Sequence, residues 1–249
     1  MTIILNKFRS GKFTSSEIGN LMSEGKTKGT WGKPALTYIE EKNMERKLQR
    51  SLTQESNARP LVWGKVLESR VFEVLGIEYT LDSQTTIQHT TIPYWSGSPD
   101  GNKLDEGKTV IDIKAPITLK SFCQLVDPLY EGLTGIDAMN KVRETHKNGE
   151  KYYWQLVSNA ILTDSKFAEL IVYVPYKDEL DKVREIVQNW ADDPNPVAWI
   201  NWASDLELPY LVKGGYYKNI NIIRFCIPEQ DKQLLTAKVE LAGKMLINI

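Results

Sequence analysis

Apolar residues recur every three to four positions in the first third of the chain, and this spacing predicts amphipathic helices. Capping residues, proline in a first turn and glycine after a last turn mark where such helices begin and end. Three helices are expected here: one that opens with the capping-box spacing of Thr14-Ser15-Ser16-Glu17 and stops at Gly25, one from Pro34 to about Arg50, and one from Pro60 to Gly76. In the second helix, four apolar side chains fall roughly on one face, namely Leu36, Ile39, Met44 and Leu48.

The hydrophobic period changes to two after Gly76, which predicts β-strands. Strands are expected over residues 77–80, 85–89, 91–95, 109–114, 167–174 and 220–227, and further helices over 152–162, 178–190 and 229–246. Residues 122–149 and 197–219 show no clear pattern. This order of elements predicts a single α/β domain, with a central mixed β-sheet flanked by helices and with extra helices in front of it.

The composition fits a soluble globular protein, with 249 residues of which 41% are hydrophobic and 25% charged. No run approaches the roughly 18 apolar residues of a membrane span, and the N-terminus lacks a signal-peptide layout, so we expect a cytoplasmic protein without membrane contact. The two cysteines and two histidines belong to no motif, which argues against a disulfide scaffold, a zinc ribbon and an iron–sulfur cluster. These four residues are interpreted as structural: Cys123, Cys226, His89 and His146.

Charge is distributed unevenly along the chain. The net charge is −1, but residues 1–70 contain 13 Lys/Arg and 7 Asp/Glu, a net of +6, whereas residues 71–249 contain 18 and 25, a net of −7. A basic first third on an acidic body indicates a surface that faces a polyanion. The basic side chains of the second helix are candidates for contact with such a polyanion, although a helical charge run is usually only solvated: Lys42, Arg46, Lys47 and Arg50.

Two carboxylates and a lysine form the strongest candidate for chemistry. Asp100 leaves the turn Ser98-Pro99-Asp100-Gly101, while Asp112 and Lys114 lie two apart on the next expected strand and therefore project from one face. A hairpin of this size can bring Asp100 beside Asp112. Hard oxygen ligands beside an amine are typical of a Mg²⁺ site for phosphodiester hydrolysis. Alone, each segment also has a simpler interpretation, as an ordinary turn and an edge strand.

Two residues on helices would complete such a site. Glu68 lies in the expected third helix, within Trp63-Gly64-Lys65-Val66-Leu67-Glu68, where it could bind or orient a metal. Gln155 follows the candidate strand, within Tyr152-Tyr153-Trp154-Gln155, where it could support the site. In isolation, Glu68 would be read as a solvated residue and Gln155 as a helix-capping one, and the three tryptophans near the motifs as core: Trp63, Trp95 and Trp154.

The combination W-G-x-x-x-E, S-P-D-G, I-D-I-K-A-P and Y-Y-W-Q, in this order, resembles the PD-(D/E)xK nuclease superfamily. It is most similar to the branch of phage lambda exonuclease and the YqaJ-type viral recombinases, over roughly residues 9–175. The resemblance implies a restriction-endonuclease-like core, with residues 1–249 as one nuclease domain. Its parts would be a basic helical segment (1–58), the catalytic core (59–176) and a C-terminal helix–strand–helix elaboration (177–249).

The resemblance also implies roles for individual residues. Asp100, Asp112 and the backbone carbonyl of Ile113 would bind Mg²⁺, for which Mn²⁺ would substitute, and Lys114 would be the catalytic lysine. Glu68 would match the helix glutamate that assists with metal, and Gln155 the glutamine of the following helix. Arg9, Ser16 and Ser98 would form a pocket for a terminal 5′-phosphate, a use that suits a guanidinium, hydroxyls and a helix N-terminus.

The function implied is Mg²⁺-dependent hydrolysis of DNA by a 5′→3′ exonuclease that acts on double-stranded ends in phage-type recombination. Such enzymes form ring-like homotrimers and work with a single-strand annealing protein, which would make this a phage or prophage protein in a bacterial host. Two alternatives stay open: an endonuclease of the same superfamily, and a catalytically inactive DNA-binding or assembly module. The second acid is Asp112 where the lambda-type enzyme has glutamate, and residues 115–154 and 178–219 are longer here.

Overall fold

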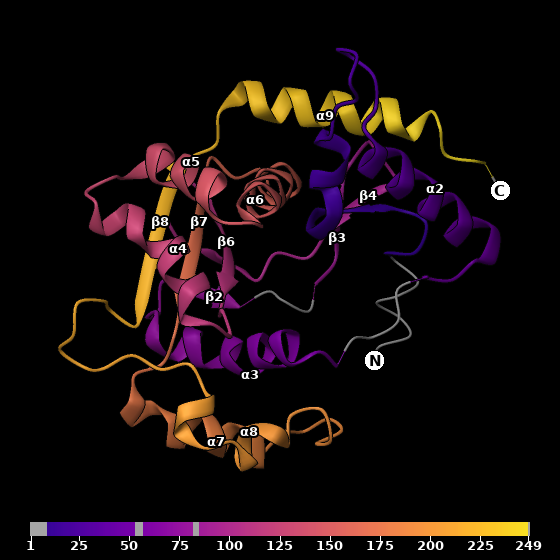
Figure 1. The fold of residues 1–249 in the computed structure, drawn as a ribbon. Coiled ribbons are helices and arrows are strands. Elements are labelled where there is room, and N and C mark those ends of the chain that lie inside the picture. The colour runs from indigo at the N-terminus through magenta and orange to yellow at the C-terminus, as the bar shows by residue number, and fades with distance from the viewer. Residues whose placement is uncertain (1–8, 53–56, 82–84, 249) are drawn as a thin grey trace.

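A five-stranded sheet lies at the centre of the computed structural model, which describes residues 9–52, 57–81 and 85–248 (Figure 1). The strand order is β2 (Tyr79–Leu81), β5 (Gly101–Lys103), β6 (Thr109–Lys114), β7 (Phe167–Tyr173) and β8 (Ile220–Cys226). Strands β6 and β7 pair in parallel and the other neighbours pair antiparallel, so the sheet is mixed. The predicted α/β fold with a mixed sheet flanked by helices is confirmed.

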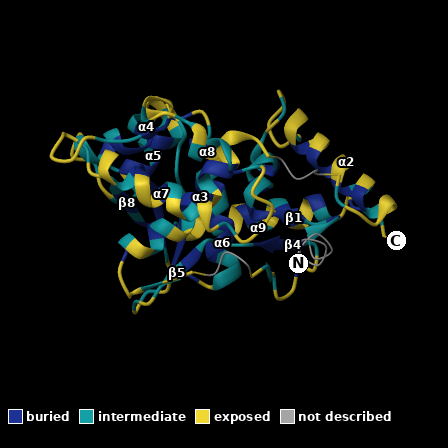
Figure 2. Cartoon of the chain, turned by 90° about the horizontal axis from the view of Figure 1, so that it is seen from below, coloured by how far each residue is buried: buried dark blue, intermediate teal, exposed yellow. Residues whose placement is uncertain are grey.

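Helices cover both faces of this sheet (Figure 1). One layer contains α4 (Leu119–Tyr130), α5 (Gly135–Thr145), α6 (Gly149–Thr163) and α9 (Glu229–Gly243). The other contains α3 (Arg59–Val74), η2 (Lys177–Glu179), α7 (Leu180–Gln188), α8 (Trp199–Trp202) and η3 (Asp205–Glu207). Successive residues of β6 serve opposite layers, because Val110 belongs to the core under α4–α6 and Ile111 to the core under α3 and α7. In Figure 2, buried residues are concentrated in the interior of the molecule and exposed ones toward its outside.

A second, three-stranded sheet carries the N-terminal segment. Its order is β1 (Phe13–Thr14), β4 (Trp95–Gly97) and β3 (Ile87–Gln88), with β1 parallel to β4. The segment after β1 is a 3-10 helix, η1 (Ser15–Met22), in which the Thr14 side chain makes no capping bond. The predicted capping box is therefore wrong. The Glu17 carboxylate instead accepts hydrogen bonds from the side chains of Asn20 and Lys151, at 2.6 Å from the lysine Nζ atom.

Helix α2 (Lys33–Leu48) has its proline in the first turn, as predicted, and buries Ile39, but the other three apolar residues of the predicted face are exposed. Leu36, Met44 and Leu48 are 42–55% exposed, whereas the buried residues include Lys42 and Glu45. An ion pair on the inner side of the helix explains why its apolar pattern misleads. None of the described helices is long and apolar enough to cross a membrane.

The expected strand over residues 91–95 lies further along the chain, as β4. The backbone N–H groups of Thr91 and Ile92 donate to the Nδ1 atom of His89, and Trp95 N donates to the carbonyl of Ile92. These local bonds fold the segment into a turn, which competes with strand pairing.

Candidate active site

The β5–β6 hairpin brings the two predicted carboxylates together. Gly101 pairs with Ile111, so Asp100, just before β5, lies beside Asp112. The Oδ2 atom of Asp100 accepts a hydrogen bond of 2.6 Å from the backbone N–H of Ile113. The first carboxylate is thus held by the backbone of the strand that carries the second.

Asp112 is held by two predicted residues. Its Oδ2 atom lies 2.5 Å from the Nζ atom of Lys114, and its Oδ1 atom accepts a 2.7 Å hydrogen bond from the Nε2 atom of Gln155 on α6. Asp112 is only 1% exposed, so removing either partner would leave a buried carboxylate poorly compensated. Lys114 and Gln155 therefore both contact Asp112, so the structure brings these three predicted residues together; their roles stay predictions.

The charges of the site are strongly coupled. Burial and the neighbouring Asp112 raise the pKa of Asp100 to about 8, although Lys114 and the N–H of Ile113 act in the opposite direction. Burial disfavours the charged form of Lys114, but the Asp112 and Asp100 carboxylates outweigh it and raise the lysine pKa. The site thus holds a lysine that stays charged beside the Asp100 carboxyl, whose ionisation is opposed by burial and by the neighbouring Asp112.

The contact between Tyr152 and Lys114 was not predicted from the sequence. The Nζ atom of Lys114 lies 4.8 Å from the centre of the Tyr152 ring, on the first turn of α6, which is cation–π distance. Tyr152 precedes Gln155 by three residues, so both project from one face of α6. That spacing inside Y-Y-W-Q was a usable signal.

Glu68 lies on α3, in the opposite helix layer from Gln155. Its carboxylate is close enough to contribute to the raised pKa of Asp100. Among the described residues, however, no three His, Cys, Asp or Glu side chains form a metal-binding group. The role of Glu68 as a metal ligand stays a prediction.

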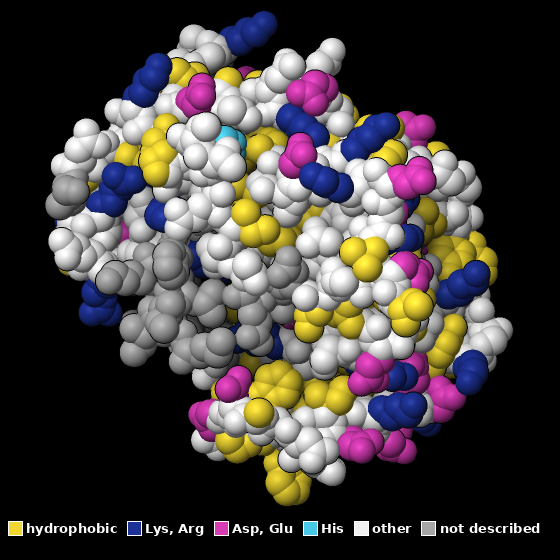
Figure 3. Space-filling view, turned by 180° about the vertical axis from the view of Figure 1, so that it is seen from behind, with side chains coloured by type: hydrophobic (Ala, Val, Ile, Leu, Met, Phe, Trp, Pro, Cys, Tyr) yellow, Lys and Arg dark blue, Asp and Glu magenta, His cyan; other side chains and the backbone are white. Residues whose placement is uncertain are grey.

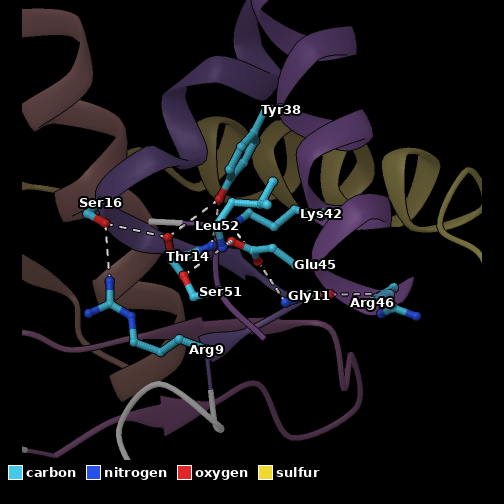
Figure 4. A network of polar contacts seen from close by, with 10 residues as sticks. All are labelled: Arg9, Gly11, Thr14, Ser16, Tyr38, Lys42, Glu45, Arg46, Ser51 and Leu52. Atoms are coloured by element: carbon cyan, nitrogen blue, oxygen red, sulfur yellow. Dashed lines mark hydrogen bonds and ion pairs between the residues drawn. The ribbon is translucent and has the colours of Figure 1, made fainter. Parts of the chain in front are cut away.

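Two of the three residues predicted for a terminal phosphate, Arg9 and Ser16, meet at the start of η1 (Figure 4). The Nη2 atom of Arg9 donates a 3.3 Å hydrogen bond to the Oγ atom of Ser16, which also lies 3.4 Å from the hydroxyl of Thr14. Within the described residues, Arg9 has no carboxylate partner. Ser98 follows β4, but its hydroxyl bonds that of Thr86 (3.1 Å) rather than Arg9 or Ser16.

The comparisons concern the fold. No protein-family model and no curated protein matches the sequence. The structure is similar to LHK-Exo, an alkaline exonuclease from Laribacter hongkongensis, in its complex with dAMP: the TM-score is 0.57 at 18% identity, over 96% of this chain and 90% of that one. It is also similar to a phage-related exonuclease from Haemophilus somnus, with a TM-score of 0.60 at 13% identity, over 94% and 92%.

The chain has the fold of these exonucleases. The structural resemblance that the motifs predicted is confirmed at this level, over nearly the whole chain.

Within this exonuclease fold, the donor set suits a hard divalent cation. Asp100 and Asp112 offer carboxylate oxygens, and their mutual repulsion, which contributes to the raised pKa of Asp100, would be relieved by a bound cation. Mg²⁺ keeps several waters and commonly takes only one or two protein carboxylates. The residues present therefore fit such an ion without a third acid.

Proposed function

We propose that the protein is a Mg²⁺-dependent deoxyribonuclease that degrades double-stranded DNA from its ends in the 5′→3′ direction. The observation that carries the proposal is the cluster of Asp100, Asp112, Lys114 and Gln155 at the end of β6, in a fold shared with exonucleases. Mn²⁺ is expected to substitute for Mg²⁺, since both accept carboxylate and water ligands.

Asp100, Asp112 and the carbonyl of Ile113 would hold the ion, with Glu68 assisting. When bound, Mg²⁺ would offset the negative charge of the phosphodiester. Lys114, fixed between Asp112 and the Tyr152 ring, would orient the attacking water and stabilise charge in the transition state. Gln155 would keep Asp112 in one orientation by its hydrogen bond.

Selection of 5′ ends would depend on the segment that bears Arg9. The Arg9 guanidinium, which has no carboxylate partner among the described residues, and the hydroxyl of Ser16 are good donors for a terminal phosphate. Ser98 would join them from the end of β4, after a rotation away from Thr86. Arg9, Ser16 and Ser98 are proposed as contacts to the DNA end.

The decisive experiment compares wild type and Asp112→Asn on end-labelled linear duplex and on a covalently closed circle. We expect wild type to release nucleotides from linear DNA only with Mg²⁺ or Mn²⁺ present, and faster when the 5′ end is phosphorylated. Asp112→Asn should lose at least about 100-fold in rate, because the buried oxygen pair would no longer carry the charge that holds the ion.

The same substrates separate the alternatives. Cutting of the closed circle would instead indicate an endonuclease. Binding of DNA without any hydrolysis in either metal would indicate an inactive module and would contradict the proposal.

We further propose, from the family resemblance, that three chains of 28.4 kDa form a ring around DNA and that a single-strand annealing protein takes up the product strand. Light scattering of the purified protein would measure the first, and co-purification with a candidate annealing protein the second. A monomer under conditions of full activity would contradict the ring.

A further inference from the structure

A buried glutamate contacts the segment that carries Arg9, through the backbone of Gly11 (Figure 4). Glu45, on α2, is 2% exposed. Its Oε2 atom accepts hydrogen bonds from the backbone N–H of Gly11 (2.8 Å) and from the Nζ atom of Lys42 (2.9 Å). Its Oε1 atom accepts from the N–H of Leu52 (3.2 Å) and from the hydroxyl of Ser51 (3.4 Å). A buried carboxylate with this many donors fixes the chain segments that supply them.

Gly11 is held from both sides by consecutive residues of α2. Glu45 accepts from its N–H, and the Nε atom of Arg46 donates to its carbonyl at 2.9 Å. Gly11 has a φ of +69°, and a Cβ placed there would lie 2.6 Å from the Cγ atom of Arg46. The glycine is therefore required both for the left-handed backbone and for the close approach of α2.

The same helix holds the other side of the segment. The hydroxyl of Tyr38 accepts a 2.8 Å hydrogen bond from the N–H of Thr14. Arg9 and Ser16 thus lie just outside two fixed points, Gly11 and Thr14, and meet each other at 3.3 Å. Fixing the backbone lowers the entropy that the long arginine side chain loses when it binds a ligand.

We propose that Glu45 is a positioning residue for recognition of the DNA 5′-phosphate, acting through Gly11 on Arg9. This rests on the proposed function, in which Arg9 and Ser16 contact that phosphate. Glu45 touches neither substrate nor the Asp100–Asp112 site, so it should affect end selection rather than hydrolysis itself.

The test is the ratio of kcat/KM on 5′-phosphorylated duplex to that on 5′-hydroxyl duplex. We expect this ratio to fall about 10-fold or more in Arg9→Ala, the size of one lost charge-assisted hydrogen bond. Glu45→Ala should lower it by a similar factor, and Glu45→Gln by less, because the amide oxygen still accepts from Gly11. Glu41→Ala, an exposed glutamate one turn earlier on α2, should leave the ratio unchanged.

The double variant Arg9→Ala/Glu45→Ala gives the sharpest result. If Glu45 acts through Arg9, the double variant should show the same ratio as Arg9→Ala alone. Multiplied effects, or an unchanged ratio in folded Glu45→Ala, would overturn the proposal. Should Glu45→Ala not fold, Gly11→Ala takes its place, since the added Cβ displaces the same segment while Glu45 remains.

A second readout separates this inference from the proposed function. Binding of the two duplexes without metal, measured by fluorescence anisotropy in the Asp112→Asn background, reports phosphate preference without hydrolysis. A wild type that cuts no DNA in Mg²⁺ or Mn²⁺ contradicts the proposed function. A normal wild type whose phosphate preference depends on Arg9 but not on Glu45 contradicts only the positioning role.

Discussion

Lys114 keeps its positive charge in a partly buried position because two carboxylates face it and the Tyr152 ring lies against it. We expect Lys114→Ala to lower kcat by about 100- to 1,000-fold with little change in KM, the usual cost of one preorganised group in a catalytic site. Single-turnover cleavage of linear duplex would measure this. Lys114→Arg should rescue little, because a planar guanidinium does not replace a compact ammonium between Asp112 and a ring.

Lys108 provides the matched control for this substitution. It lies in the same β5–β6 hairpin, is mostly exposed and, among the described residues, forms an ion pair with Asp164 alone. Lys108→Ala should therefore keep full activity. A Lys114→Ala protein with wild-type turnover would contradict the assignment of the catalytic lysine.

The protonation of Asp100 predicts a pH-dependent affinity for Mg²⁺. Its pKa is about 8 in the folded, metal-free protein, against an ordinary value of 3.8, so the site binds a proton that the ion must displace. The apparent affinity should rise by up to about tenfold per pH unit between pH 6 and 8 and level off above. Calorimetric titration at several pH values would measure both affinity and proton release, and Asp100→Asn should abolish the pH dependence.

The same shift has a consequence for stability. Between pH 4 and 8 the folded protein binds the Asp100 proton and the unfolded chain does not, so this group's contribution to the unfolding free energy falls as pH rises. Without metal at pH 8 or above, Asp100→Asn should raise stability by about 1–3 kcal/mol, since a neutral amide replaces a buried, repelled carboxylate. Urea denaturation at pH 5 and pH 8 would show the gain only at the higher pH.

For single residues, the sequence predicted the positions that follow from the alternation of side chains along a strand and from the length of a hairpin. The alternation of a strand placed Asp112 and Lys114 on one side, and hairpin length placed Asp100 beside them. The contacts of Glu45 outside its own helix were not predictable, because Gly11 lies 34 residues earlier and Leu52 seven later, and a glutamate on a helix is usually solvated.

Helix α6 links the candidate active site to β4 and to the first residue of η1 through polar residues three apart. Tyr152 contacts Lys114, Gln155 contacts Asp112, and the buried hydroxyl of Ser158 lies 2.8 Å from both the Oγ atom of Ser15 and the Nε1 atom of Trp95. This spacing keeps all three on one face of the helix. One element thus aligns the catalytic strand with β4 and η1.

Loss of the Ser158 hydroxyl tests that connection. Ser158→Ala leaves the indole N–H of Trp95 without an acceptor in the interior, so we expect a loss of about 1–3 kcal/mol in the free energy of unfolding. Chemical denaturation would measure it, with Ser69→Ala, an exposed serine on α3, as the unaffected control. Equal stabilities for the two variants would show that the hydroxyl does not hold the elements together.

Elements with a regular pattern were predicted well, and those with a broken pattern were not. Strand β6 spans the predicted residues 109–114, because four of its six side chains are buried and turns flank it. Helices α4 and α5 went unassigned in residues 122–149, since α4 contains Pro128 and α5 is polar on most of its surface. Packing against β7 and β8, rather than a regular apolar pattern in the sequence, stabilises α4 and α5.

At the scale of the whole molecule, fewer basic side chains of residues 1–70 are available to a polyanion than their number suggests, because several already have partners. Lys42 pairs with Glu45, Arg46 donates to backbone carbonyls, and Arg70 contacts Glu73 and Glu179. On the face drawn in Figure 3, basic and acidic side chains are interspersed over much of the surface. Lys42 and Arg46 therefore have a structural role in place of the predicted contact with a polyanion. Lys47 and Arg50 are exposed and stay candidates for that contact.

Segments near both ends of the described chain contact α2. Arg46 contacts Gly11 near one end, and Asn43 and Arg46 contact residues 245–247 near the other. Asn43 donates to the carbonyl of Met245 (3.0 Å) and accepts from the N–H of Ile247 (2.8 Å), while Arg46 donates to the carbonyl of Ile247 (2.9 Å).

We expect Asn43→Ala to lower the free energy of unfolding by about 1–2 kcal/mol, seen as a fall in Tm of a few degrees. Glu40→Ala, exposed on the same helix, should not change Tm. In a chain that lacks residues 244–249, Asn43→Ala should have no further effect, because both of its partners are gone. An undiminished loss there would show that Asn43 stabilises α2 by itself rather than by holding the C-terminal segment.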